Sequence, residues 1–222
     1  MILTTCAVCA APLAGDAPAA PAHCGNCQTR YCSDRQLAHG LFEAKRHDEA
    51  LSVWEVDVAT EERLGTSELN TLLTRGNLVL GYYNVGRIDD ALRLQREVYA
   101  GYQSIDVSSE LRRECLDSAV SNLIELLGAT REFEEAKSLA REKIPAIIDR
   151  HGPDHTLTLE VRTWYARALF LEGEDLSEAE SVLEDVWRRS KRVLGDSYPD
   201  TERARKFLEE VRSVRADAAE EN

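Results

Sequence analysis

The sequence predicts an all-α protein: about four helical hairpins stacked side by side, a terminal helix, and a small cysteine-rich module at the N-terminus. Three observations lead to this prediction. An alanine-centred motif recurs four times, linkers rich in Gly, Pro and Asp recur in the same phase, and five of the six cysteines lie within the first 32 residues. Internal repeats with a period of about 20–50 residues are typical of solenoids, in which neighbouring repeats bury one another.

The N-terminal cysteines are spaced like metal ligands. Cys6 and Cys9 form one CxxC pair, Cys24 and Cys27 form a second, and Cys32 follows. In an intracellular protein such thiol arrays usually bind metal rather than form disulfides. Thiolates with an occasional imidazole suit Zn²⁺, which they hold tetrahedrally. Because the Ala/Pro-rich loop between the pairs cannot pack a core, we expect one or two zinc ions to stabilise this segment.

The stretch Cys24-Gly-Asn-Cys27-Gln-Thr-Arg-Tyr-Cys32-Ser resembles the MYND-type zinc finger, and the resemblance covers about residues 6–47. It implies two zinc ions in a cross-brace. The first CxxC pair would share one ion with Cys32, and the second pair would hold the other.

The finger departs from the MYND pattern at its sixth ligand, where Gln36 or, with one deletion, Arg35 stands. The last ligands are expected at His39 and His47. Two alternatives follow from this departure. Either water or His23 completes the first site, or a single zinc ion is held by four of the five cysteines.

The rest of the chain repeats a short motif that ends in alanine. It occurs as His47-Asp-Glu-Ala50, Ile88-Asp-Asp-Ala91, Phe133-Glu-Glu-Ala136 and Leu176-Ser-Glu-Ala179. The alanines are 41, 45 and 43 residues apart. Each is predicted to start the second helix of a hairpin, at a point where the first helix crosses so closely that a small residue is needed.

Glycine-containing linkers share this phase. Gly65, Gly152 and Gly195 are predicted to end helices, and the Asp or Thr residues that follow are predicted to start the next ones. The same phase places the first helix of the first hairpin at about residues 34–46, where the last helix of a MYND finger would also lie. One helix is therefore expected to serve both modules.

A third pattern comprises Asn77-Leu78-x-x-x-Tyr82-x-x-x-Gly86-x-x-x-x-Ala91 and its echo from Asn122-Leu123 to Ala136. With the linker Leu194-Gly-Asp-Ser-Tyr-Pro-Asp-Thr201, it resembles the long tetratricopeptide repeats (TPR) of kinesin light chains over about residues 36–201. The resemblance implies a right-handed superhelix whose first helices line a groove for an extended peptide.

The same resemblance implies which residues line the groove. Asn77 and Asn122 would bind the peptide backbone, and Gln36 and Trp164 fill the equivalent slots in the first and last hairpins. The alternative is that Asn77 and Asn122 only satisfy backbone groups between neighbouring helices.

Composition excludes several other classes of function. The chain is 30% charged and 43% hydrophobic and has no run of about 18 apolar residues, so we expect no membrane span. The opening segment lacks the basic region of a secretory signal, which favours an intracellular, cytoplasmic protein, with the nucleus also possible. The net charge of −13 disfavours direct nucleic-acid binding. Without expected strands, a catalytic triad or a phosphate-binding loop, we expect no enzyme.

The predicted organisation is a finger over residues 1–35, whose last helix extends to about residue 47, a solenoid over 36–212 and an acidic tail over 213–222. The leading interpretation is a protein–protein interaction scaffold that binds a linear peptide in the TPR groove, with the finger as a cap or a second contact. One alternative is a transcription-related adaptor recruited through the finger. Another is a regulatory fragment related to MYND- and TPR-containing lysine methyltransferases but lacking their catalytic domain. The oligomeric state is left open.

Overall fold

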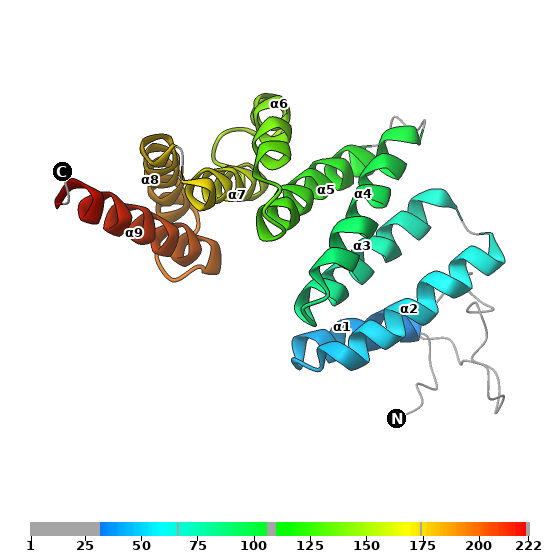
Figure 1. Ribbon diagram of the computed structural model, residues 1–222. Helices are drawn as coiled ribbons and strands as arrows, with labels where there is room; N and C mark the ends of the chain where they lie inside the picture. Colours follow the sequence, from blue (N-terminus) through cyan, green and yellow to red (C-terminus); the bar gives the residue numbers. More distant parts are fainter. Residues whose placement is uncertain (1–31, 66, 106–109, 174, 221–222) are drawn as a thin grey trace. The chain divides into compact units, whose positions relative to one another are not determined.

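A computed structural model of the 222-residue chain describes residues 32–65, 67–105, 110–173 and 175–220. Within these ranges all regular structure is helical and no strand occurs, which confirms the predicted all-α class (Figure 1). The helices are α1 (Cys32–Glu43), α2 (His47–Leu64), α3 (Glu68–Asn84), α4 (Ile88–Ser104), α5 (Glu110–Ala129), α6 (Phe133–His151), α7 (Thr156–Glu172), α8 (Leu176–Val193) and α9 (Pro199–Glu220). None of the helices in the described part is long and apolar enough to cross a membrane.

The helices follow one another along the chain as the sequence predicts. Three-residue turns join α1 to α2, α3 to α4, α5 to α6 and α7 to α8, and α9 follows as the terminal helix. The first helix begins at Cys32 and ends at Glu43, a little earlier than expected, because the turn before the alanine motif occupies three residues. The contacts of the chain form two compact units, which divide within α4: one ends at Ala91 and the other begins at Leu92.

The repeated alanine is the fourth residue of each second helix. Ala50, Ala91, Ala136 and Ala179 are all fully buried, which agrees with the predicted need for a small side chain. Each alanine N–H donates a hydrogen bond of 3.0 or 3.1 Å to the last carbonyl of the preceding turn, closing the first helical turn. Acidic residues just before the alanine face the positive end of the helix dipole and stabilise it.

The predicted helix ends are also found. Gly65, Gly152 and Gly195 have φ angles of 59°, 89° and 93° and follow the last residues of α2, α6 and α8. Helix α7 begins at Thr156, as expected, although the residue that caps it is neither Asp nor Thr. His155 caps α7 by accepting a 3.3 Å hydrogen bond through Nδ1, because Asp154 is instead held by two arginines of α8.

In the first unit, the core is built around one tryptophan. Trp54 of α2 is fully buried, and the rings of His39 and Phe42 from α1 lie 5.8 and 5.7 Å from its ring. Gly81 of α3 faces the same indole: a Cβ at this position would lie 3.0 Å from Trp54 and 3.1 Å from Leu51. At this point α2 and α3 therefore pack so closely that a side chain at position 81 would require Trp54 and Leu51 to shift.

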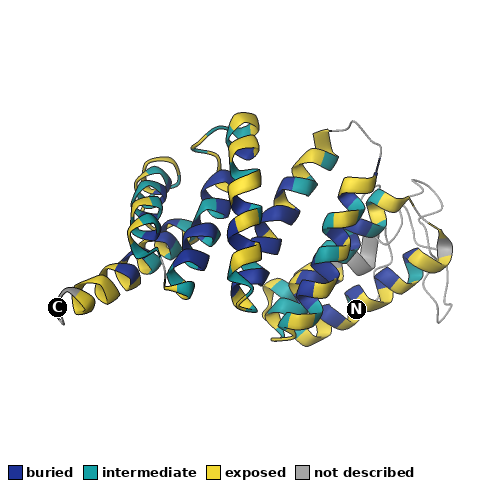
Figure 2. Ribbon diagram, turned by 45° about the horizontal axis from the view of Figure 1, so that its top comes forward, coloured by how far each residue is buried: buried dark blue, intermediate teal, exposed yellow. Residues whose placement is uncertain are grey.

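In the second unit, α7 is the central helix. Leu159 of α7 packs with Val186 of α8 and Ala204 of α9, and Val182 and Trp187 cover this cluster. Most residues of α7 are buried or half-buried, whereas α9 is exposed beyond its buried Val211 (Figure 2). Helix α7 is thus positioned by neighbours on several sides, which makes it a rigid support for the side chains it exposes.

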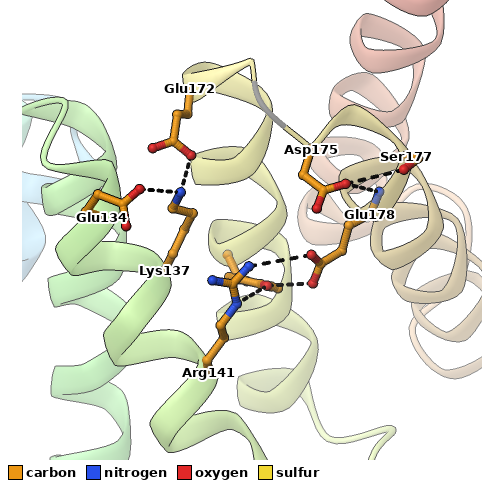
Figure 3. A network of polar contacts seen from close by, with 8 residues as sticks. Glu134, Lys137, Arg141, Glu172, Asp175, Ser177 and Glu178 are labelled. Carbon is orange, nitrogen blue, oxygen red and sulfur yellow. Dashed lines mark hydrogen bonds and ion pairs between the residues drawn. The ribbon is translucent and has the colours of Figure 1, made fainter.

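A polar network ties α6 to α7 and α8 in this unit (Figure 3). The ammonium of Lys137 lies between the carboxylates of Glu134 and Glu172. One turn further along α6, Arg141 donates a 3.0 Å hydrogen bond to the hydroxyl of Tyr165, and that hydroxyl donates a 2.6 Å bond to Glu178. One series of hydrogen bonds therefore links side chains of α6, α7 and α8.

The terminal helix is longer than predicted. It continues to Glu220, whereas the sequence led us to expect an acidic tail from residue 213. Arg212 donates a 2.8 Å hydrogen bond to Glu180 of α8, and Arg215 pairs with the same carboxylate. These ion pairs to a neighbouring helix extend the helix into a segment whose composition alone favours fraying.

Candidate peptide-binding face

The exposed side of the first helices in the second unit is the candidate site. Residues spaced by four, three and four positions lie on one side of an α-helix. This surface, termed the first-helix face, comprises Ser118, Asn122, Glu125 and Ala129 of α5, Glu160, Trp164, Arg167 and Leu171 of α7, and Arg203, Phe207, Glu210 and Val214 of α9. None of these side chains is buried, so the face is open to a ligand.

Aromatic and cationic side chains alternate where α7 and α9 meet. The rings of Trp164 and Phe207 lie 6.0 Å apart. The guanidinium of Arg203 lies 5.1 Å from the Trp164 ring, and that of Arg167 lies 4.4 Å from the Phe207 ring. These are cation–π distances, and such contacts hold the rings in fixed positions. The two helices therefore present one continuous aromatic surface rather than two separate rings.

Charges on the face are paired only in part. Arg203 forms a 2.9 Å ion pair with Asp200, and Arg167 pairs with Glu210. Glu160 has a pKa above the usual range, because it is largely removed from solvent and lies near Asp200, while Arg203 opposes this shift. The nearby indole N–H of Trp164 also lowers the pKa of Glu160. Its geometry toward Glu160 is not that of a hydrogen bond, so the buried Nε1 has no hydrogen-bond partner among the described residues.

The predicted amides are on first helices of both units. Asn122 is exposed on α5, and Asn77 is half-buried on α3 in the first unit. Within the described part of the chain neither amide makes a side-chain hydrogen bond, so their donors and acceptors are available to a ligand. Gln36 lies on α1, but its side chain is outside the described residues.

The predicted zinc ligands are mostly outside the described residues. This holds for Cys6, Cys9, Cys24, Cys27 and the side chain of Cys32. His39 is exposed and lies edge-on to Trp54, and His47 lies 4.9 Å from the ring of Phe42. In the part of the chain that the structure describes, no group of three or more His, Cys, Asp or Glu side chains could hold a metal ion. The zinc site therefore stays a prediction.

Sequence reasoning missed the α9 side of the face. Trp164 and Phe207 are 43 residues apart, the interval that also separates Ala136 from Ala179. Extending this period by one repeat would have found Phe207. Within the printed sequence no alanine motif follows Phe207 to mark its place in the repeat.

Similarity to known proteins agrees with this architecture. Residues 71–105, which cover most of α3 and all of α4, match the sequence model of the tetratricopeptide repeat. No curated protein sequence matches the chain.

Solved structures extend the similarity to most of the chain. Two crystal structures of a Podosopora anserina protein, described as a kinesin light chain with nearly identical TPR-like repeats, align with it. One aligns with a TM-score of 0.62 at 20% identity and covers 86% of this chain and 96% of the other. The second aligns with a TM-score of 0.60 at 21% identity, over 85% and 96% of the two chains. BtubC (BKLC) from P. vanneervenii aligns with a TM-score of 0.55 at 12% identity, over 77% and 74%.

At these identities the structural similarities establish the fold, while the family match covers one repeat. The structural similarities and the family match both agree with the helical hairpins described above, with their buried alanines and three-residue turns. The protein is an all-α chain that contains tetratricopeptide repeats and shares its fold with kinesin-light-chain-like repeat proteins.

Proposed function

We propose that the protein is an interaction scaffold whose first-helix face binds an extended peptide. The observation that supports this most directly is the row formed by Asn122, Trp164 and Phe207 on α5, α7 and α9. It presents an amide without a hydrogen bond in the described residues, followed by two partly exposed rings held by arginines. Amides suit the backbone of an extended peptide, and aromatic rings suit its side chains.

Asn122 and Trp164 have separate roles in this proposal. Asn122 hydrogen-bonds the peptide backbone, and Trp164 packs against a peptide side chain. Asn77 on α3 and Gln36 on α1 are the equivalent positions of the first unit, where they would act in the same way.

Peptide display against the full chain tests this function. We expect an enriched motif whose binding is lost in Asn122→Ala/Trp164→Ala. Arg188→Ala, at an exposed position of the second helix α8, serves as the matched control and should bind normally. Because removal of Trp164 also deletes packing, circular dichroism must show that the variant is folded, and Trp164→Phe should retain part of the binding. The proposal is wrong if no motif is enriched, or if the double variant binds as the wild type does.

We further propose that the N-terminal segment is a zinc-stabilised finger held by Cys6, Cys9, Cys24, Cys27 and Cys32, with His39 and His47 as the remaining candidate ligands. The support is the spacing of the thiols and the position of Cys32 at the first residue of α1, as expected for a helix shared by finger and repeat. In this role the finger caps the first hairpin or makes a second contact.

Metal analysis of the purified full chain tests the finger. One or two zinc ions per chain are expected, with a clear loss in Cys24→Ser/Cys27→Ser. Cys115→Ser, which alters a lone cysteine on α5, should leave the zinc content unchanged. A chain purified from zinc-containing medium without bound metal would remove the finger from the proposal. If the finger is a cap, the cysteine variant should also melt at a lower temperature.

A further inference from the structure

We propose that the first-helix face selects a basic peptide, that is, an extended segment rich in Lys and Arg. This inference deepens the proposed function and rests on it. Its basis is the charge that the face leaves unbalanced, beside aromatic rings that suit cationic side chains.

Charge is distributed unevenly between first and second helices of the second unit. The second helices α6 and α8 each carry four acidic and four basic residues, so they are balanced. The first helix α5 carries four acidic but only two basic residues. The first helix α7 carries two acidic and two basic residues and α9 carries six and five, so the negative excess of the first helices lies mainly on α5.

Individual contacts show the same imbalance. The two arginines of the face are already paired, Arg167 with Glu210 and Arg203 with Asp200. Glu160 forms no ion pair with any described residue, and neither does the exposed Glu114, one helical turn before Ser118 on the same side of α5. These two carboxylates are thus available to cations of a ligand, while an acidic ligand would meet repulsion.

The aromatic pair suits the same ligand. Guanidinium groups stack on tryptophan and phenylalanine rings, and the aliphatic stems of Lys and Arg pack against them. Arg203 and Arg167 already use part of these rings in this way, which shows that the geometry accepts cations.

Burial of Glu160 adds a physical reason for a cationic ligand. Its raised pKa means that the charged form is disfavoured in the free protein. A ligand cation beside this carboxylate would stabilise its charged form. Part of the binding free energy would then come from offsetting the desolvation of Glu160.

The test uses the full chain and three sets of synthetic peptides of equal length and equal aromatic, Gly and Pro content. The sets differ only in whether their variable positions are Lys/Arg, Gln/Asn or Asp/Glu. Binding is measured by fluorescence polarisation at low and high salt. We expect the basic set to bind tightest, with affinity falling as salt rises because charge pairs at a surface are screened.

Variants locate the effect. Glu114→Gln/Glu160→Gln should weaken binding of the basic set by about 3- to 10-fold and reduce its salt dependence, the range expected for two partly exposed charge pairs. Glu142→Gln/Asp149→Asn removes the same charge from the exposed side of α6 and should change nothing.

The outcomes separate the two proposals. Neutral or acidic peptides that bind as well as basic ones, or basic binding that the face variant does not weaken, would overturn the charge selection while leaving peptide binding intact. Failure of all three sets to bind would overturn peptide binding itself, and the charge selection with it.

Discussion

At the scale of single residues, the turn between paired helices shows how local strain is distributed. The middle residue of the turn has a positive φ in three hairpins: 62° at Lys45, 80° at Gly86 and 67° at Arg131. This left-handed conformation costs a residue with a side chain about 1–2 kcal/mol, and glycine almost nothing. The same turn is therefore built with glycine in one repeat and with strained basic residues in two others.

Exchanging the residues tests this strain. Lys45→Gly should raise the free energy of unfolding by about 0.5–1 kcal/mol, since relief of strain exceeds the added freedom of the unfolded chain. The reciprocal Gly86→Ala should lower it by about 1 kcal/mol. Urea denaturation followed by circular dichroism measures both. Equal stability of Lys45→Gly and the wild type would show that the turn tolerates a side chain without strain.

Glu160 gives a pH-dependent prediction at the same scale. The pKa of Glu160 is raised in the folded protein, mainly by burial. Above that pKa the ionised carboxylate therefore destabilises the fold. This destabilisation disappears as the pH falls toward the pKa that Glu160 has in the unfolded chain. Glu160→Gln should therefore melt at a higher temperature than the wild type at pH 7, and the difference should shrink near pH 4. A difference that stays constant over this range would mean that ionisation of Glu160 is not the cause.

At the scale of helices, α3 contains two glycines in different surroundings. A Cβ at Gly81 would meet the fully buried Trp54 at 3.0 Å, whereas a Cβ at Gly76 would meet nothing within 4 Å. The sequence does not distinguish them, because both are helix-interior glycines. Only the packing of α2 against α3 makes one of them necessary.

Alanine at each position tests this difference. Gly76→Ala should raise the free energy of unfolding by about 0.5–1 kcal/mol through helix propensity alone. Gly81→Ala gains the same propensity but forces Trp54 to move, so a net loss of about 1 kcal/mol or more is expected. Denaturation followed by tryptophan fluorescence compares them. If both variants are stabilised, the two helices are not as close as described.

The polar network between α6, α7 and α8 gives a further prediction for packed helices. Tyr165→Phe removes the hydroxyl that joins Arg141 to Glu178 but keeps the buried ring. We expect a loss of about 1 kcal/mol, the usual value of a hydrogen bond in a folded protein. Phe170→Tyr at a half-buried position of α7 serves as a control that adds a hydroxyl outside this network. A neutral Tyr165→Phe would show that Arg141 and Glu178 pair equally well without the hydroxyl.

At the scale of the whole molecule, charge is distributed unevenly over the helices. In the second unit the second helices α6 and α8 are balanced, while the first helix α5 carries four acidic and two basic residues. In the first unit the excess lies on the second helix α2, which carries six acidic residues and one basic residue. The overall charge of −13 is therefore spread unevenly over the chain, and a large part of it lies outside the first helices. A total charge cannot reveal this uneven distribution.

The sequence by itself determined the all-α class, the hairpins and the glycines that end α2, α6 and α8. It did so because the alanine motif and the glycine stops act locally: a small residue at a helix crossing and a left-handed helix end are required wherever the repeat occurs. It also located Asn122 and Trp164 on first helices. The N-terminal zinc ligands remain a prediction from spacing alone.

Tertiary structure decided what depends on neighbours distant in sequence. It extended α9 to Glu220 through ion pairs with α8, placed Phe207 and two arginines around Trp164, and left Glu160 without an ion pair among the described residues. Periodicity gives the side of a helix on which a residue lies, but not which side chain of the next helix stands opposite. That pairing is set by the packing of helices about 40 residues apart in the chain, so the contacts of Phe207 and Arg203 with Trp164 follow only from the fold.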